Sequence, residues 1–335
     1  MDEYILQVNN LQTYFKMDSG TLKAVDDVTF SLKRNEIIGV IGESGCGKSV
    51  TAHSILRTIQ SPGRIVGGEI LYREESGEPV DLIQQKPDGK YIRSLRGAKI
   101  SMIFQEPMAS LSPVYTIGAQ MVEAITIHQK KKDKAAAKAK CIEMLERVGL
   151  SDSKKCFNSY PHQLSGGMCQ RAMIALALLN EPEILIADEP TTALDVTVQA
   201  QIMDLMKEFQ KNLGMSIIYI THDMGVIAEM ADSIAVMYLG RIVESGDTRE
   251  IFKNPMHPYT RRLLKSMPVL GKKQGTRLDA IEGNVPIPLD PPVQCGFFSR
   301  CQETLPECDG NVPPLIEVTP NHLVRCCHYK ENGGE

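Results

Sequence analysis

The chain has 335 residues, of which 42% are hydrophobic and 23% charged, and its formal net charge is −4. This length predicts about two domains with a packed core, and the negative charge argues against a general nucleic-acid-binding protein. No run approaches the ~18 consecutive apolar residues of a membrane-spanning helix, and the first residues lack the basic and apolar segments of a signal peptide. We therefore expect a cytoplasmic protein whose nine cysteines are thiols or metal ligands rather than disulfides.

A glycine-rich loop follows the first predicted strands. Ile5–Val8 and Ala24–Leu32 are predicted strands, and the apolar stretch Glu36–Ile41 is predicted to be a buried strand. The next eight residues fit the phosphate-loop pattern G-x-x-x-x-G-K-S, and a helical spacing of apolar residues follows them. Such glycines let backbone N–H groups surround a triphosphate, while the lysine reaches its β- and γ-phosphates and the last serine binds Mg²⁺. The nucleotide-binding residues predicted here are Gly42, Ser44, Gly45, Cys46, Gly47, Lys48, Ser49 and Val50.

Tyr14 and Phe15 precede this loop, and either ring is able to stack on a purine base. Ordinary core packing explains both aromatic residues equally well.

The middle of the chain changes character twice. Glycines and prolines recur from Pro62 to Gly97 and predict turns. A predicted strand over Lys99–Phe104 then ends at Gln105. Helical spacing over Ile117–Gln129 and Lys134–Val148 predicts a mostly helical insertion at residues 106–165.

Strands and helices alternate again after this insertion. The predicted elements are a helix over Met168–Leu179, a strand over Glu183–Ala187, a helix over Thr197–Leu213, a strand over Ser216–Ile220, a helix over 224–231 and a hairpin over Ser233–Val243. Alternation of this kind predicts a parallel α/β sheet that binds its ligand at the carboxyl ends of its strands.

Polar residues stand at the ends of these strands, where a bound nucleotide and its metal ion are expected. Asp188 is placed to associate with Mg²⁺ beside the phosphate loop. Glu189 faces differently and is placed to orient or deprotonate an attacking water. Gln105 and His222 are able to reach the γ-phosphate or its metal, although each residue alone would more often be structural.

Ser165-Gly166-Gly167 opens a helix and forms a second anion-binding geometry. It lies far along the chain from the phosphate loop. The chain thus has two predicted phosphate-binding sites but only one lysine-bearing loop. This suggests that two chains face each other and that each chain completes the nucleotide site of the other.

These motifs together resemble the ATP-binding subunit of an ABC transporter over residues 5–250. In chain order they match its Walker A, Q-loop, signature, Walker B, D-loop and H-loop elements: Gly42–Ser49, Gln105, Leu164–Met168, Ile184–Glu189, Ala193-Leu194-Asp195 and His222. The resemblance implies an α/β P-loop NTPase fold of the ABC type, with an antiparallel β subdomain. It divides the chain into a nucleotide-binding core with its β subdomain (residues 1–105 and 166–250), a helical subdomain (106–165) and a C-terminal extension (251–335).

The resemblance also implies the roles of the site residues. Lys48, Gln105, Glu189 and His222 are expected to act in catalysis, and Ser49, Gln105 and Asp188 to surround Mg²⁺. Ser165, Gly166 and Gly167, with Asp195, are expected to complete the ATP site of a partner subunit in a head-to-tail dimer. The adenine-stacking role falls on Tyr14 or Phe15. Asn35 stands where the family usually has glycine, and we expect it to adopt a positive φ, which asparagine tolerates.

The C-terminal extension carries a separate signal. Residues 283–330 are rich in proline, hold five of the nine cysteines and have too little apolar periodicity for a core of their own. The spacing Cys295-x5-Cys301-x6-Cys308-x17-Cys326 permits tetrahedral Zn²⁺ or an iron–sulfur cluster.

The stretch Asn254–Leu264 and this cysteine-rich tail are similar to the dipeptide and oligopeptide importer ATPases. This resemblance favours a structural [4Fe–4S] cluster, and it favours Cys326 over Cys327 because His322-x3-Cys326 matches the ending of the family.

The resemblance thus implies an ATP-hydrolysing motor for a di- or oligopeptide importer, peripheral at the cytoplasmic face of the cell membrane. Its expected partners are a second ATPase subunit, two transmembrane permeases and, indirectly, an extracytoplasmic substrate-binding protein, with no nucleic acid. An importer for nickel or another small solute is an alternative, because substrate choice lies in the other subunits. A soluble ABC ATPase of DNA repair or translation is less favoured, because those proteins carry tandem ATPase units or coiled-coil insertions that this chain lacks.

Overall fold

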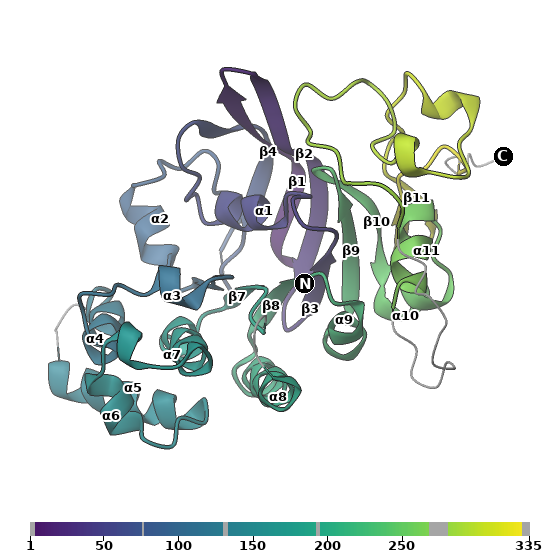
Figure 1. Cartoon of the computed structure of the whole chain (residues 1–335). Helices are drawn as coiled ribbons and strands as arrows, with labels where there is room; N and C mark the ends of the chain where they lie inside the picture. The colour runs from purple at the N-terminus through teal and green to yellow at the C-terminus, as the bar shows by residue number, and fades with distance from the viewer. Residues whose placement is uncertain (1–3, 76, 130–132, 192–194, 268–280, 330–335) are drawn as a thin grey trace. The chain divides into compact units, whose positions relative to one another are not determined.

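The computed structural model describes residues 4–75, 77–129, 133–191, 195–267 and 281–329 (Figure 1). The chain forms two compact units, the first from residues 1–84 and 219–335 and the second from residues 85–218. The second boundary falls inside strand β8 (Ser216–Thr221). Within the described ranges, no helix has both the length and the apolar character needed to span a bilayer.

The first unit contains an antiparallel sheet with the strand order β2-β1-β4-β5. Its strands are β1 (Tyr4–Met17), β2 (Gly20–Lys33), β4 (Gly63–Tyr72) and β5 (Val80–Asp81). Strand β1 pairs with β2 on one edge and with β4 on the other, and bulges interrupt both ladders. Because β1 is bonded on both edges, it extends well beyond the predicted Ile5–Val8 and includes Tyr14 and Phe15.

The turns predicted at Gly63, Gly67 and Gly68 are wrong, because these residues belong to β4. Gly68 has φ +88°, and a Cβ there would lie 2.5 Å from the carbonyl oxygen of Asn10. The glycine therefore serves a close approach at the bulge in β1 rather than a turn.

A second set of strands in the first unit positions the phosphate loop. Strand β3 (Ile37–Ile41) runs parallel to β9 (Ser233–Tyr238), which pairs antiparallel with β10 (Arg241–Asp247). All residues of β3 are buried, as the sequence predicts. Helix α9 (Met224–Met230) packs on β3 so closely that a Cβ on Gly39 would meet Ile227 at 2.7 Å. Helix α1 (Lys48–Ile55) follows the loop and is tied to β1 by a buried hydroxyl contact between Ser54 and Thr13 at 2.8 Å.

The C-terminal extension is built onto this unit. It begins within α10 (Thr248–Lys253) and contains α11 (Pro258–Lys265), the 3-10 turns η2 (Phe298–Arg300) and η3 (Pro306–Cys308), and strands β11 (Ile316–Thr319) and β12 (His322–Val324). Strand β12 pairs with both β10 and β11, so the extension adds two strands to the sheet that contains β3, β9 and β10 (Figure 1). A backbone bridge between Leu22 and Leu289 joins it to β2. The proline- and cysteine-rich segment, which lacks apolar periodicity, is therefore held by main-chain pairing with β10 and β2.

The second unit contains the parallel pair β6 (Ile100–Ile103) and β7 (Ile184–Asp188). Its helices are α2 (Lys90–Leu95), α3 (Pro107–Ser110), α4 (Ile117–Thr126), α5 (Lys134–Arg147), α6 (Ser153–Asn158), the 3-10 turn η1 (Pro161–Gln163), α7 (Gly166–Leu178) and α8 (Val196–Leu213). Helices α4 to α7 pack against one another (Figure 1). The predicted helical character of residues 106–165 is thus confirmed, whereas the division of the chain into three functional parts stays a prediction.

Candidate nucleotide-binding and catalytic site

The phosphate loop closes around the side chain of Lys48. Lys48 is 5% exposed, and its ammonium donates to the carbonyl oxygens of Gly42 at 2.7 Å and Glu43 at 3.0 Å. The same ammonium lies 3.7 Å from the sulfur of Cys46. The lysine is therefore held inside the loop that its motif predicts it to serve.

Two glycines of the loop are required by close backbone contacts. A Cβ on Gly47 would lie 2.2 Å from the carbonyl oxygen of Ala24, and a Cβ on Gly42 would lie 2.2 Å from that of Met237. Gly47 also has φ +104° and is the N-cap of α1 without a side-chain cap. The loop thus packs on β2 and β9, and no side chain of the described residues caps the start of α1, which suits the binding of an anion.

The C-terminal extension contacts the same loop at Glu43. The backbone N–H of Glu43 donates to the hydroxyl of Tyr259 at 2.9 Å. Arg300 donates to both carboxylate oxygens of Glu43, at 2.7 and 3.0 Å. No local sequence pattern connects Tyr259 or Arg300 with Glu43, because both lie more than 200 positions away from it along the chain.

The two candidate adenine-stacking residues have different surroundings. The Tyr14 hydroxyl donates to Asp26 at 2.5 Å, and burial together with Asp26 raises the pKa of Tyr14 above its ordinary value. The Lys23 ammonium lies 5.5 Å from the centroid of the Tyr14 ring. The Phe15 ring instead lies against Gly63, where a Cβ would be 2.5 Å from the ring. Both side chains are half-buried, so burial does not decide which ring stacks on adenine. The adenine-stacking role of either residue stays a prediction.

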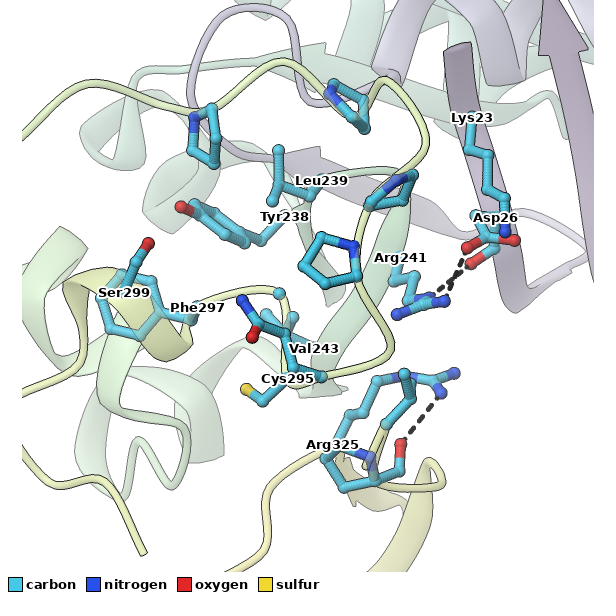
Figure 2. Close-up of a pocket in the computed structure, with 18 of the residues that line it drawn as sticks. Lys23, Asp26, Tyr238, Leu239, Arg241, Val243, Cys295, Phe297, Ser299 and Arg325 are labelled. Atoms are coloured by element: carbon cyan, nitrogen blue, oxygen red, sulfur yellow. Dashed lines mark hydrogen bonds and ion pairs between the residues drawn. The ribbon is translucent and has the colours of Figure 1, made fainter. Parts of the chain in front are cut away.

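The pocket drawn in Figure 2 lies between β2, β9, β10 and the C-terminal extension, with a volume of about 170 Å³. Arg241, on its wall, pairs with Asp26 at 2.6 Å, and Arg325 pairs with Asp27 at 2.9 Å. Because each arginine is already neutralised by an aspartate of β2, we interpret the pocket as the seam that joins the extension to that strand.

In the second unit, the predicted catalytic carboxylate and glutamine contact each other. Asp188 ends β7 and is 3% exposed, and Glu189 follows it half-buried with φ 48°. The Gln105 side chain donates to Glu189 at 3.1 Å. Gln170 of α7 donates to the carbonyl oxygen of Pro190. The residues after β7 are therefore bound both to the Q-loop glutamine and to the helix that begins at the signature motif.

The signature serine and the D-loop aspartate line one open cavity of about 430 Å³ in the second unit, together with Gly167 and Arg171. Ser165 caps α7 by accepting from the N–H of Met168 at 3.3 Å, and Asp195 caps α8 by accepting from Val198 at 3.0 Å. Arg171 donates to the carbonyl oxygens of Val148 and Gly149. A helix start and a guanidinium in one cavity suit a phosphate group.

The remaining predicted residues fall into two groups. His222 is exposed directly after β8 and belongs, with Lys48 and Ser49, to the first unit. Gln105, Ser165, Asp188 and Glu189 belong to the second unit. Ala193 and Leu194 of the predicted D-loop lie outside the described residues. Asn35 has φ 60°, which confirms the positive φ predicted for it.

Five thiols of the extension line a single small pocket: Cys295, Cys301, Cys308, Cys326 and Cys327. Backbone N–H groups donate to the sulfurs of Cys301 and Cys308, both at 3.4 Å. Burial raises the pKa of Cys326 to about 11. No three of the described His, Cys, Asp and Glu side chains are arranged around one metal ion.

Comparisons with known proteins show the family of the chain. Residues 25–192 match the model of the ABC transporter family, and residues 243–308 match that of the oligopeptide/dipeptide transporter C-terminal region. A putative peptide import ATP-binding protein of Brucella melitensis is 46% identical over 333 residues, with 98% of each chain covered. The oligopeptide transport ATP-binding protein AppD of Bacillus subtilis is 44% identical over 332 residues, with 99% of this chain and 98% of the relative covered.

Among solved structures, the ADP- and phosphate-bound dimer of the ATP-binding cassette MJ0796 is similar, with a TM-score of 0.65 and 26% identity. The match covers 73% of this chain and 99% of the cassette. The P-loop fold predicted from the sequence is thereby confirmed. The chain belongs to the ABC transporter family, as an ATP-hydrolysing, ATP-binding subunit of its oligopeptide/dipeptide group.

Proposed function

We propose that this chain powers a membrane importer for di- and oligopeptides. The observation that carries the substrate class is that residues 243–308 match the C-terminal region of oligopeptide/dipeptide transporters. This region also contacts the phosphate loop, through Tyr259 and Arg300 at Glu43. Relatives of nearly identical length that are named for peptide import or oligopeptide transport support the same conclusion. The subunit is peripheral at the cytoplasmic face and works with two permeases, a second ATPase and, indirectly, a substrate-binding protein.

We assign the hydrolytic roles as follows. Backbone N–H groups of the loop and Lys48 bind the phosphates, and the ring of Tyr14 or Phe15 stacks on the adenine. Glu189 accepts a proton from the attacking water while Gln105 orients its carboxylate, and His222 acts at the γ-phosphate. The Ser49 hydroxyl and the Asp188 carboxylate are oxygen donors of the kind that Mg²⁺ prefers, and Gln105 is the third residue assigned to it. Bound there, Mg²⁺ would neutralise charge on the phosphates.

Two such subunits close on ATP in this proposal. Ser165, Gly166, Gly167 and Asp195 of one subunit complete the nucleotide site of the other. The capped start of α7 and the nearby Arg171 support this assignment, because they provide donors and positive charge for an anion. Hydrolysis then lets the subunits part, and this cycle drives the permeases.

We further propose that the thiol pocket holds an iron–sulfur cluster through Cys295, Cys301, Cys308 and Cys326. The donor set fits such a group, because these four thiols line one pocket and the sulfurs of Cys301 and Cys308 each accept a main-chain hydrogen bond. A single Zn²⁺ instead needs all its sulfurs about 2.3 Å from one point. The described side chains offer no such single-ion arrangement, and the preference for a cluster over zinc rests on the resemblance of the cysteine-rich tail to the peptide-importer ATPases. Cys327 donates to the Glu307 carbonyl at 3.6 Å and is left out of the proposed set.

The transport proposal is tested by anaerobic affinity purification from native membranes, followed by mass spectrometry and reconstitution of the purified complex in lipid vesicles. We expect two multi-spanning proteins, a second ATPase and a peptide-binding protein, with ATPase activity that di- or oligopeptides stimulate. Stimulation by Ni²⁺ and not by peptides would establish the small-solute alternative. Recovery of soluble ribosomal or DNA-associated proteins alone would overturn transport.

The cluster proposal is tested by iron, zinc and acid-labile sulfide analysis of the anaerobically purified chain. Iron and sulfide in equal amounts are expected, with Cys326→Ser losing both and Cys327→Ser retaining them. Stoichiometric zinc, or iron retained by Cys326→Ser, would contradict the proposed ligand set.

A further inference from the structure

One charged pair joins the C-terminal extension to the phosphate loop. Arg300 makes a bidentate ion pair with Glu43, the second residue of the loop. The Arg300 side chain is 4% exposed and that of Glu43 is 26% exposed. A fork of this kind fixes the position and the orientation of the carboxylate together.

The other partners of Arg300 are uncharged. Its guanidinium donates to the carbonyl oxygens of Glu282 at 3.1 Å and Gly283 at 3.0 Å, and to the hydroxyl of Tyr238 at 3.3 Å. The bond to Glu43 is the main reason that the pKa of Arg300 lies above its ordinary value. The arginine is thus held by the extension, and its charge is directed at the loop.

The backbone of Glu43 is held from both sides. Its N–H donates to the hydroxyl of Tyr259, and its carbonyl oxygen accepts from Lys48. Tyr259 is fully buried and packs its ring against Phe297, which lies three residues before Arg300. A displacement of the Glu43 side chain would therefore be transmitted to the ammonium that binds phosphate.

An unneutralised carboxylate in a phosphate loop opposes the binding of a triphosphate, because like charges repel strongly where water is partly excluded. We propose that Arg300 is a positioning residue for nucleotide binding: it neutralises Glu43 and holds it away from the phosphates. ATP affinity thereby depends on the folded C-terminal extension. This inference rests on the phosphate loop being the ATP site.

The test is the dissociation constant of the magnesium complex of a non-hydrolysable ATP analogue, measured by calorimetry on the anaerobically purified full chain. In Arg300→Gln we expect the dissociation constant to rise at least about tenfold, as for the loss of one partner of a partly buried pair. The increase should be smaller for ADP, because ADP carries less charge. The KM for ATP should rise by a similar factor while kcat changes little.

A double variant distinguishes the effect of the unpaired Glu43 charge from structural damage caused by the loss of Arg300. Glu43→Gln combined with Arg300→Gln removes both charges, and we expect it to bind the analogue within about threefold of the wild type, as neutral side chains restore electrostatic balance. Arg300→Lys keeps the charge but loses the fork, so its affinity should be intermediate.

Arg325 provides a matched control. It is also a buried arginine of the extension beside a pocket cysteine, and it pairs with a partly exposed aspartate, Asp27, at 2.9 Å. Arg325→Gln should lower thermal stability without weakening nucleotide binding. The inference would be overturned if Arg300→Gln bound the analogue as tightly as the wild type, or if Arg325→Gln weakened binding as much as Arg300→Gln does. It would also be overturned if adding Glu43→Gln to Arg300→Gln did not restore the affinity. If the wild-type chain bound no analogue, the ATP site itself would be refuted instead.

Discussion

Glu189 has a backbone conformation that its residue type seldom adopts. Its φ of 48° lies in the left-handed region, which costs a non-glycine residue about 1 kcal/mol. Its carboxylate accepts a hydrogen bond from the side chain of Gln105. Strain of this kind at a strand end is consistent with the catalytic role proposed for the side chain.

Glu189→Gln should therefore slow hydrolysis without preventing ATP binding. An amide is almost the same shape as a carboxylate but cannot accept the proton of the attacking water, and loss of a general base costs roughly 10²–10⁴-fold in rate. Single-turnover hydrolysis alongside nucleotide titration measures both quantities. Turnover close to that of the wild type would remove Glu189 from its role.

Cys46 lies inside the phosphate loop but is only 1% exposed. Burial raises the pKa of its thiol, with Lys48 opposing the shift. Because the thiolate is the reactive form, alkylation of Cys46 at neutral pH should be slow. Once complete, it should abolish ATP binding, because the added group would occupy the loop. Time-resolved mass spectrometry of maleimide labelling, paired with nucleotide titration, checks both statements. Rapid labelling, or full ATPase activity after complete labelling, would contradict them.

At the scale of the element, the phosphate loop contains two glycines that provide a matched comparison. Gly45 has φ +81°, and no atom of the described residues lies within 4 Å of an added Cβ, whereas Gly47 has φ +104° with the Ala24 oxygen at 2.2 Å. Both alanine variants incur backbone strain, but only Gly47→Ala also forces β2 and the loop apart.

We expect Gly45→Ala to lower the free energy of unfolding by about 1 kcal/mol and Gly47→Ala by about 2–4 kcal/mol, the sum of strain and overpacking. Chemical denaturation of the nucleotide-free chain measures this difference. Equal losses in the two variants would mean that the contact with Ala24 does not constrain the loop.

Helix α11 begins with an unusual cap. The His257 ring accepts a hydrogen bond from the N–H of Tyr259 at 3.0 Å and is buried, and burial lowers the pKa of His257 to about 4. Between the ordinary pKa of 6.5 and this value the unfolded chain binds a proton that the folded chain excludes. The contribution of His257 to the free energy of unfolding is therefore fully present above about pH 6.5. It falls by up to about 3 kcal/mol as the pH is lowered towards 4.

His257→Asn keeps a side-chain acceptor at the cap but does not titrate. Its stability should fall less than that of the wild type between pH 6.5 and 4, as measured by denaturant unfolding at several pH values. Parallel curves for the two proteins would show that His257 does not bind a proton on unfolding.

At the scale of the whole molecule, the chain carries a phosphate loop in its first unit and the signature cavity in its second. If the cavity completes the site of a partner, slow hydrolysis should trap a dimer. Glu189→Gln with ATP should elute as a dimer on size exclusion, and addition of Ser165→Arg should return it to monomer, because a bulky side chain would block the helix start. A Glu189→Gln chain that stays monomeric with saturating ATP would count against closure between identical subunits.

Much of the site was predictable because it depends on local geometry. The phosphate loop, the buried strand before it, the positive φ of Asn35 and the helix that starts after Ser165 each follow from a few neighbouring residues. The periodicity of apolar residues and the backbone preferences of single residues act over a few neighbouring positions, so one sequence is sufficient to predict these features. Strand β4 was missed for the opposite reason: its glycines suit a bulge in β1, and only pairing with β1 explains them.

The sequence by itself determined the ATP-binding motifs, their order and the cysteine spacing. Only the tertiary structure decided that the extension adds β12 to the sheet, that Gln105 contacts Glu189, and that Arg300 and Tyr259 hold Glu43. Contacts between residues more than 200 positions apart, such as Glu43 and Arg300, depend on how complete elements pack. Packing is a property of the assembled chain, and it is encoded in no short stretch of residues.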